Sequence, residues 1–489
     1  TPDQDGIISK LLKESAKELV SVFTYLINLI FTKGQVPNIF KIAIMKPIFK
    51  KGEPNLAINY RPISLISNVA KIFEKALKQR LTNYLSHNEI LSKFQYGFRP
   101  KKSTNDAIAV LISNVYQSID NRKKCAAVFI DLAKAFDTVC HHRLLSKLES
   151  IGIRGIALSI FESYLHEWKQ IVRIGDSHSD EKTMTYGVPQ GTVISPTLFN
   201  VYINELLSID IDGSIVAYCD DTVYSIEGDS WIEIENKMQE DLKKIIEWFD
   251  MNLLSINPQK TIYLPFASYS TGLPETTKIS INVETRNENW EIKSENAANY
   301  LGIVIDSHLR WDIQIQNLTK KIRSLIYMVS QLVKICNINI VKSVYFSLVQ
   351  SLLNYGILAW GGAYENAMKP LEIAQRRILK IMCKLPKRFS TEELYKYAGI
   401  LSVKQLYYKN CILHLAKTQQ ITHNITHNHD TRFSKTNKLI LPKMKKTIGQ
   451  SYYLYIGLEV YNVIPIELKN DIHKKRFKKQ INSWLLQNT

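Results

Sequence analysis

The chain has 489 residues, 45% of them hydrophobic, so it is long enough for roughly three domains with substantial cores. Its 63 lysine and arginine residues outnumber the 45 aspartate and glutamate residues, and the net charge of +18 predicts a polyanionic partner, with nucleic acid ahead of an anionic membrane surface. The six cysteines form no C-x-x-C pair, which argues against a zinc module or a disulfide framework and favours a reducing compartment. The chain starts at threonine without a signal peptide, as a fragment of a longer protein would.

The N-terminal part predicts helices followed by a strand. Residues 1–40 are typical of helices that close at Gly34 and Pro37. The apolar run from Leu19 to Phe31 is interrupted by polar residues and is shorter than the ~20 residues that a bilayer span needs, so we expect a packed helix there. Residues 42–49 are mostly apolar, which predicts a strand.

Two basic residues flank this predicted strand. Lys50 follows it directly, and Arg61 lies in the Asn59–Ser64 segment. An ammonium and a guanidinium group on loops beside a strand are suited to triphosphate oxygens, and a solvated basic loop is the alternative. The apolar spacing from Val69 to Leu85 predicts the next helix.

A Gly-, aromatic- and Lys/Arg-containing segment comes next, from Gln95 to Thr104. Aromatic rings stack on bases and cations follow a phosphate backbone, so this segment suits contact with a single-stranded template. We predict a helix from Asn105 to about Asp120. The apolar run from Cys125 to Ile130 then predicts a strand that is buried on both faces and ends at Asp131.

The adjacent carboxylates of Asp220 and Asp221 lie between two predicted strands within Ser214–Ile226. Adjacent acids repel each other, and an exposed acidic turn is one explanation for them. The other is Mg²⁺, which takes one or two carboxylates and completes its shell with water and substrate phosphates. Asp131 supplies a third carboxylate if its strand lies beside this pair. Three convergent carboxylates can hold two Mg²⁺ ions, one activating an attacking hydroxyl and one stabilising a leaving pyrophosphate.

Two further segments carry candidate site residues. Phe136 follows Asp131 closely, and its ring either packs in a core or lies under the sugar of an incoming nucleotide. The Tyr186–Pro196 loop has glycines that permit close backbone approach to a ligand, and Gln190 is the polar group expected to meet a base or a template sugar. Ser195 is predicted to cap a helix that directs four apolar side chains inward, those of Leu198, Phe199, Tyr202 and Leu206.

Taken together, these motifs resemble the reverse transcriptases of jockey-like non-LTR retrotransposons. The resemblance covers roughly residues 5–385, and its motifs occur in the order of that family. They are Asn59–Ser64, Gln95–Thr104, Phe129–Asp137, Gly187–Pro196, Tyr218–Asp221, Asn257–Thr261 and Tyr300–Gly302. Cys219 stands where the family commonly has alanine, and Phe40 where it often has tryptophan.

The resemblance implies an α+β right-hand polymerase: fingers, a palm with an antiparallel sheet and a helical thumb, plus a small, mostly helical C-terminal region. The implied boundaries are 1–125 for the N-terminal extension and fingers, 126–302 for the palm, 303–390 for the thumb and 391–489 for a basic C-terminal region. Within them we expect a small strand pair in 263–299 and thumb helices at 312–334, 341–359 and 368–384.

The resemblance also assigns roles to individual residues. Catalysis and two Mg²⁺ ions fall to Asp131, Asp220 and Asp221. The implied nucleotide-binding residues are Lys50, Arg61, Phe136 as a ribose gate, Gln190 and Lys260, and the implied primer grip is Leu301 and Gly302. The implied partners are an RNA template, a DNA primer or target DNA, and deoxynucleoside triphosphates, with no membrane. We expect the protein to act inside the cell, on nuclear DNA.

Other interpretations remain open from the sequence. The chain could be a nucleic-acid-binding relic without catalysis, a group II intron-type reverse transcriptase, or an RNA-dependent RNA polymerase. The intact aspartates argue against a relic, and the Lys134–Asp137 motif argues against a group II intron-type enzyme. Phe136 at the sugar position argues against an RNA-dependent RNA polymerase. No endonuclease or RNase H pattern is evident, so we expect primer extension without nicking. His423 and His427 have helical spacing, but a flexible linker explains this polar stretch better than a metal site.

Overall fold

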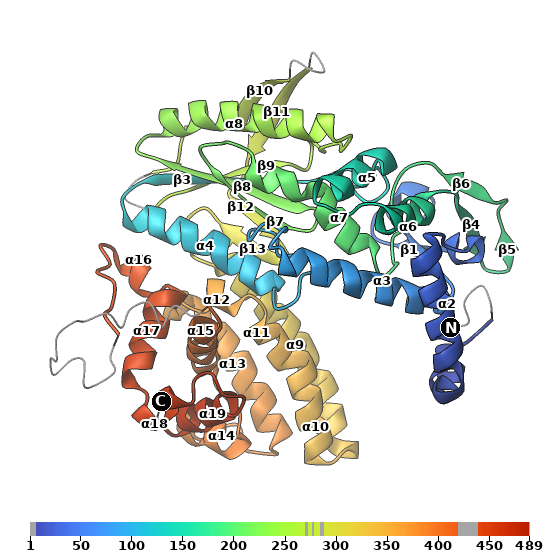
Figure 1. The fold of residues 1–489 in the computed structure, drawn as a ribbon. Coiled ribbons are helices and arrows are strands. Elements are labelled where there is room, and N and C mark those ends of the chain that lie inside the picture. The colour runs from blue at the N-terminus through green and yellow to red at the C-terminus, as the bar shows by residue number, and fades with distance from the viewer. Residues whose placement is uncertain (1–5, 269–271, 276–277, 284–287, 419–438, 489) are drawn as a thin grey trace.

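The computed structural model describes residues 6–268, 272–275, 278–283, 288–418 and 439–488. A central sheet lies between α8 (Trp231–Met251) on one face and α4 (Thr104–Asp120) on the other, with a bundle of helices beyond α4 (Figure 1). This arrangement confirms the predicted α+β right-hand fold. Among the described residues, no helix combines the length and the apolar character needed to cross a bilayer.

The palm sheet has six strands in the order β10-β11-β9-β3-β8-β7. Neighbours are antiparallel except β11 and β9, which run parallel. Every β3 residue after the first is buried, as the apolar run predicts, because helices cover both faces of this central strand. The strands are β3 (Lys124–Ile130), β7 (Ser214–Tyr218), β8 (Asp221–Gly228), β9 (Ile262–Phe266), β10 (Lys278–Val283) and β11 (Glu288–Ser294).

Alternate residues of β3 belong to two different hydrophobic cores. Ala127 and Phe129 pack with α4 and the helices beyond it, whereas Val128 and Ile130 pack with α8 and the fingers helices. The strand alternates in this way because successive side chains point to opposite faces of a sheet. Its C-terminal end, where Asp131 follows, therefore lies at the junction of the two cores.

The fingers are built around a second sheet, in which β1 (Ile42–Phe49) pairs antiparallel with β2 (Tyr60–Leu65) and parallel with β4 (Trp168–Ile174). The predicted strand 42–49 is confirmed to the residue, while Arg61 lies on β2 rather than on a loop. The remaining strands and helices are β5 (Ser177–His178), β6 (Lys182–Met184), α3 (Asn68–His87), α5 (His141–Ser150), α6 (Ile156–Leu165) and α7 (Ser195–Ile203).

The N-terminal helices α1 (Ser9–Glu14) and α2 (Ala16–Lys33) lie at the edge of the fingers, away from the helical bundle (Figure 1). Gly34 ends α2 in the left-handed conformation, as predicted. The packed helix expected there is confirmed for its second half, where Leu26, Ile27 and Phe31 pack against the fingers core, whereas its first half is largely exposed. Ile30 is the buried side chain of this helix, and Tyr25 is 71% exposed.

The thumb begins after a hairpin of β12 (Ala297–Tyr300) and β13 (Ile303–Asp306). The single helix predicted for 341–359 is broken before Gly356, whose left-handed backbone (φ +63°) lies where any Cβ would meet Ile303 Cδ1 at 2.1 Å. The helices are α9 (Asp312–Ile335), α10 (Ile338–Val344), a π-helical turn (Tyr345–Gln350), α11 (Ser351–Asn354), α12 (Ile357–Trp360) and α13 (Glu365–Met382).

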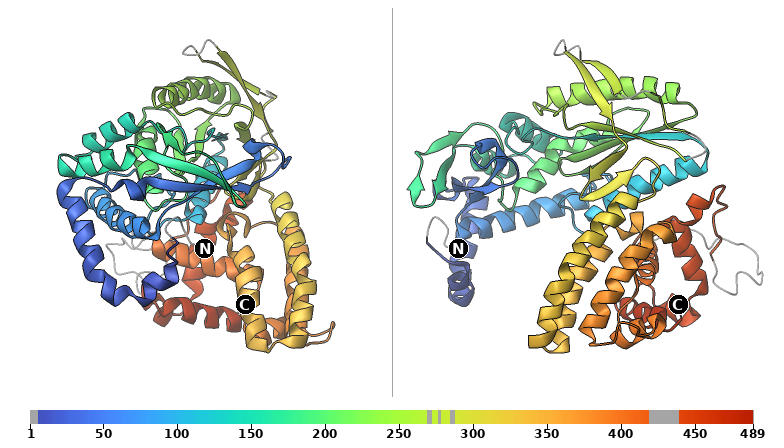
Figure 2. Two further views of the ribbon diagram at one scale, coloured as in Figure 1. Left: turned by 90° about the vertical axis from the view of Figure 1, so that its right-hand side faces the viewer. Right: turned by 180° about the vertical axis from the view of Figure 1, so that it is seen from behind.

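The C-terminal region packs beside the thumb and against α4, as the two views in Figure 2 also show. The Lys417 ammonium lies 2.7 Å from the Asp106 carboxylate at the start of α4, and the Lys445 amide donates to Asp120 at its end. The linker proposed around His423 and His427 lies outside the described residues. The helices are α14 (Thr391–Ala398), α15 (Val403–Lys417), α16 (Thr447–Gln450), α17 (Tyr453–Val463), α18 (Ile466–Asn470) and α19 (Phe477–Asn488).

Candidate active site

The acidic pair lies at a tight hairpin, as the sequence predicts. Strands β7 and β8 pair from Ser214 to Tyr218, and the turn between them consists of Cys219 and Asp220. Cys219 has φ +61°, a left-handed conformation that typically costs a non-glycine residue about 1–2 kcal/mol. Asp221 is the first residue of β8, so the turn fixes the backbone of both acids.

Asp131 reaches the same place from β3. The antiparallel ladder pairs Ile130 with Thr222, so the next position along β3 lies opposite Asp221. Opposed residues in such ladders have Cβ atoms roughly 5 Å apart, which makes the two carboxylates neighbours. The Asp131 carbonyl accepts a hydrogen bond from the Asn257 amide at 2.8 Å, which ties the strand end to the loop before β9.

The site concentrates negative charge. Surrounding protein and then the carboxylates of Asp220 and Asp131 raise the pKa of Asp221 to about 6, even though its side chain remains partly open to solvent. The cationic groups of Arg61 and Lys50 act in the opposite direction, so the β1–β2 hairpin of the fingers presents positive charge to this part of the palm.

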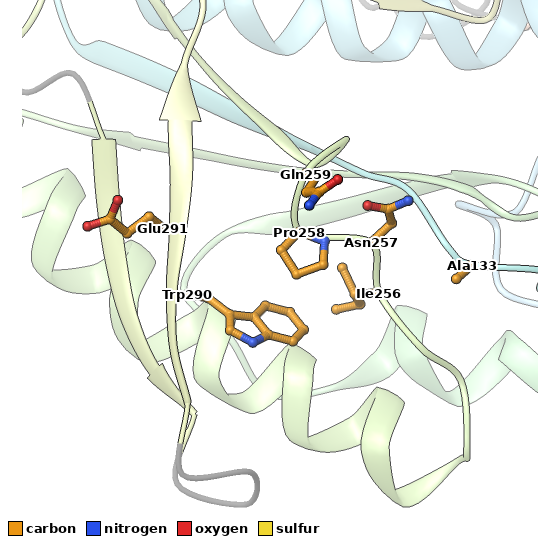
Figure 3. A pocket seen from close by; sticks show the side chains of 7 residues that line it. All are labelled: Ala133, Ile256, Asn257, Pro258, Gln259, Trp290 and Glu291. Carbon is orange, nitrogen blue, oxygen red and sulfur yellow. The ribbon is translucent and has the colours of Figure 1, made fainter. Parts of the chain in front are cut away.

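Lys260 forms an ion pair with Asp131. Its ammonium is 3.4 Å from Asp131 Oδ2, and both side chains are well exposed. Beside it, a pocket of about 590 Å³ is lined by residues of the loop before β9 and of β11. Figure 3 shows the ring of Trp290 directed toward Pro258 and Ile256 in this pocket.

Phe136 and Gln190 lie together at a second edge of the site. The Phe136 ring is half-buried and stacks on the fully buried Phe199 ring, with centroids 4.8 Å apart. The Gln190 amide donates to Asp137 Oδ1 at 2.9 Å, and the Val188 amide donates to the Phe136 carbonyl at 2.8 Å. These bonds fix the glycine-containing loop against the segment that carries Phe136.

Leu301 and Gly302 form the turn between β12 and β13, where both have positive φ. The Tyr355 hydroxyl donates to the Leu301 carbonyl at 2.5 Å, so the turn is attached to the base of the thumb. Its position between palm and thumb is compatible with contact to a primer strand.

The Gln95–Thr104 segment differs most from the prediction. Gln95 is completely buried, and its side chain bonds within the protein instead of facing a template. Arg99 donates to the Gln95 carbonyl at 3.3 Å, while Phe98 remains 50% exposed. The sequence carried no signal for the burial of Gln95, because a polar residue beside basic and aromatic ones is typical of a surface.

The helix after the loop begins one position away from the prediction. Ser195 is the first residue of α7, and Ile194 occupies the capping position without a side-chain bond. The Ser195 hydroxyl bonds instead to that of Thr192 inside the loop. The four apolar residues expected to point inward are fully buried: Leu198, Phe199, Tyr202 and Leu206.

Two curated proteins are similar to this chain in sequence. The probable RNA-directed DNA polymerase from transposon BS of Drosophila melanogaster is 27% identical over 83% of this chain and 45% of its own length. The RNA-directed DNA polymerase from mobile element jockey of the same species is 26% identical over 80% of this chain and 43% of its length. The chain thus spans less than half of either relative.

Among solved structures, telomerase from Candida albicans in complex with a TWJ fragment of telomeric RNA is similar with a TM-score of 0.42 and 13% identity, over 76% of this chain and 65% of that one. The family model described as reverse transcriptase (RNA-dependent DNA polymerase) matches residues 48–305. That stretch contains Lys50 and Arg61, all three carboxylates and the β12–β13 turn. The similar transposon polymerases confirm the jockey-like non-LTR resemblance. The chain therefore belongs to the reverse transcriptase family.

Proposed function

We propose that this chain extends a DNA primer on an RNA template by nucleotidyl transfer assisted by two Mg²⁺ ions. The observation that supports this most is the meeting of Asp131 with Asp220 and Asp221 at one end of paired strands. Desolvation and then the like charges of Asp220 and Asp131 raise the pKa of Asp221, and a bound divalent cation would offset this cost of ionising the carboxyl group. The net charge of +18 suits a nucleic-acid partner.

The chemistry of the donor set fits magnesium. Asp131, Asp220 and Asp221 offer only oxygen ligands, which hard divalent cations prefer. When bound, the ions would activate the primer hydroxyl and stabilise charge on the leaving pyrophosphate. Within the described ranges, no three acidic, histidine or cysteine side chains are grouped so that they could already hold a metal ion.

Three cationic side chains would handle the triphosphate. Lys50 and Arg61 act electrostatically on Asp221 from the fingers, where they would bind phosphate oxygens of an incoming nucleotide. Lys260, beside Asp131, would donate a proton to the leaving pyrophosphate.

The remaining residues would position the nucleotide and the primer. Phe136, supported from behind by Phe199, would lie under the sugar and exclude a 2′-hydroxyl. Gln190 would line the nucleotide pocket, oriented by its bond to Asp137. The Leu301–Gly302 turn would hold the primer terminus.

Primer extension on an RNA template tests the proposal directly. We expect deoxynucleotide incorporation that requires Mg²⁺ and stops with a chelator. Asp220→Asn should lower the rate by roughly two to three orders of magnitude, because it removes charge at the reacting centre. Asp176→Asn, in an exposed turn of the fingers, is the matched control. An Asp220→Asn protein as fast as the control would refute the assignment.

A further inference from the structure

The catalytic hairpin has a buried backbone amide at its turn. Cys219 is 2% exposed, and its N–H lies at the first position of the turn, outside the β7–β8 ladder. A buried amide without an acceptor is strongly unfavourable. The acceptor is the side-chain oxygen of Gln95, which receives the Cys219 amide at 3.0 Å.

The same oxygen also receives the Gly97 amide, at 2.8 Å. A planar carbonyl oxygen has two lone pairs, so these two bonds saturate it. The Gln95 amide nitrogen, in contrast, has no hydrogen-bond partner within the described part of the chain. The side chain therefore acts at this place through its oxygen.

The backbone around Gln95 is fitted to the hairpin. The Tyr96 amide donates to the Ala217 carbonyl at 2.8 Å, which attaches this segment to β7. A Cβ on Gly97 would stand 2.3 Å from the Cys219 nitrogen, so only glycine allows the approach. Asn200 of α7 then donates to the Gly97 carbonyl at 2.7 Å and holds the glycine in place.

We propose that Gln95 is a positioning residue for the reaction: its side-chain oxygen holds the Cys219 amide and thereby keeps the strained turn that orients the Asp220 and Asp221 carboxylates. This inference rests on the proposed polymerase function. Gln95 itself touches no reacting atom. It acts from a segment of the fingers, so the geometry of the carboxylates depends on the packing of fingers against palm.

The first test replaces the oxygen while keeping the shape. Gln95→Met preserves length and flexibility but leaves two amides without an acceptor. We expect kcat for primer extension to fall about tenfold and the half-saturating Mg²⁺ concentration to rise. A variant that is merely less stable would lose active protein without any change in half-saturating Mg²⁺. An unchanged Mg²⁺ dependence would overturn the proposal.

A second substitution distinguishes strain at the turn from general damage. Glycine adopts φ +61° without a steric penalty. Alanine, like cysteine, has a Cβ atom and keeps that penalty. Adding Cys219→Gly to Gln95→Met should therefore restore several-fold more activity than adding Cys219→Ala, which is the matched control. Equal activities of the two double variants would overturn the role in holding the turn.

A third measurement does not depend on activity. Alkylation of the buried Cys219 thiol, mapped by mass spectrometry, reports opening of the hairpin, and the buried Cys125 thiol on β3 is the reference. Gln95→Met should accelerate alkylation of Cys219 relative to Cys125, and an unchanged ratio would overturn the proposal. If the wild-type protein failed to extend any primer, the proposed function would fall, while this comparison would still test the hairpin.

Discussion

The acidic cluster should destabilise the protein when no metal is bound, and Asp221 offers the sharpest test. Its pKa is raised from 3.8 to about 6, chiefly by the surrounding protein, then by Asp220 and Asp131. Such a shift corresponds to about 3 kcal/mol if the group is fully shielded. Because the Asp221 side chain is partly open to solvent, we expect Asp221→Asn to raise the free energy of unfolding by only about 1 kcal/mol at pH 8.

The direction of the pH dependence follows from linkage. A carboxyl group with a raised folded-state pKa binds its proton more tightly in the folded protein than in the unfolded chain. The contribution of Asp221 to stability therefore falls as the pH rises from about 4 to 6 and stays low above 6. The advantage of Asp221→Asn should accordingly be largest at pH 8 and shrink toward pH 4.

Urea unfolding in the presence of a chelator measures this difference, with Asp176→Asn as the exposed control. Adding Mg²⁺ should then stabilise the wild type by about 1.4 kcal/mol at ten times its Kd, and the Asp221→Asn protein by less. If Asp221→Asn destabilised the metal-free protein at pH 8, the inferred cost of ionising Asp221 beside the other carboxylates would be wrong.

Three other predictions concern the sugar gate, a buried histidine and the basic surface. Phe136→Val should lower the preference for deoxynucleotides over ribonucleotides roughly tenfold or more, measured as a ratio of kcat/KM values, and an unchanged ratio would exclude a gate at this residue. Burial lowers the pKa of His414 to about 4, so the unfolded chain binds a proton below pH 6.5 that the folded protein rejects. Wild-type stability should therefore fall by about 2 kcal/mol more than that of His414→Leu between pH 7 and pH 5, and equal losses would contradict this. Affinity for nucleic acid should decrease linearly with salt on logarithmic axes, because phosphate contacts release counterions, and a flat line would remove the case for a basic binding surface.

The sequence predicted those elements whose signal is local. Strand β3 was predicted from an uninterrupted apolar run, and α3 and α9 from apolar residues at helical spacing. Strand β9 was missed because Pro265 and a polar surrounding concealed a five-residue strand. The predicted boundary at residue 390 stays a prediction, but residues on both sides of it share one hydrophobic core, and such sharing leaves no trace in local composition.

In the candidate site, too, features with a local signal could be predicted and features that depend on distant contacts could not. The three aspartates could be singled out as candidates because each lies at a strand end and because their motifs resemble a known family. The orientation of those acids could not be predicted, since it depends on contacts between distant segments. The bond between Gln95 and Cys219 is an example: neither residue alone indicates a partner, and the pairing of Gln95 with Ala217 exists only in the folded chain.

The β7–β8 hairpin depends on residues that are distant in the sequence. A turn with left-handed Cys219 and two adjacent carboxylates is unfavourable by itself, both in backbone strain and in charge. The hydrogen bonds between its strands do not select this turn, because any antiparallel hairpin makes the same bonds. The stabilising groups come from elsewhere: an acceptor from Gln95 and positive charge from Arg61. Since these groups belong to the fingers, separating fingers from palm would remove the support and the opposing charge together, and the carboxylates would lose their common orientation.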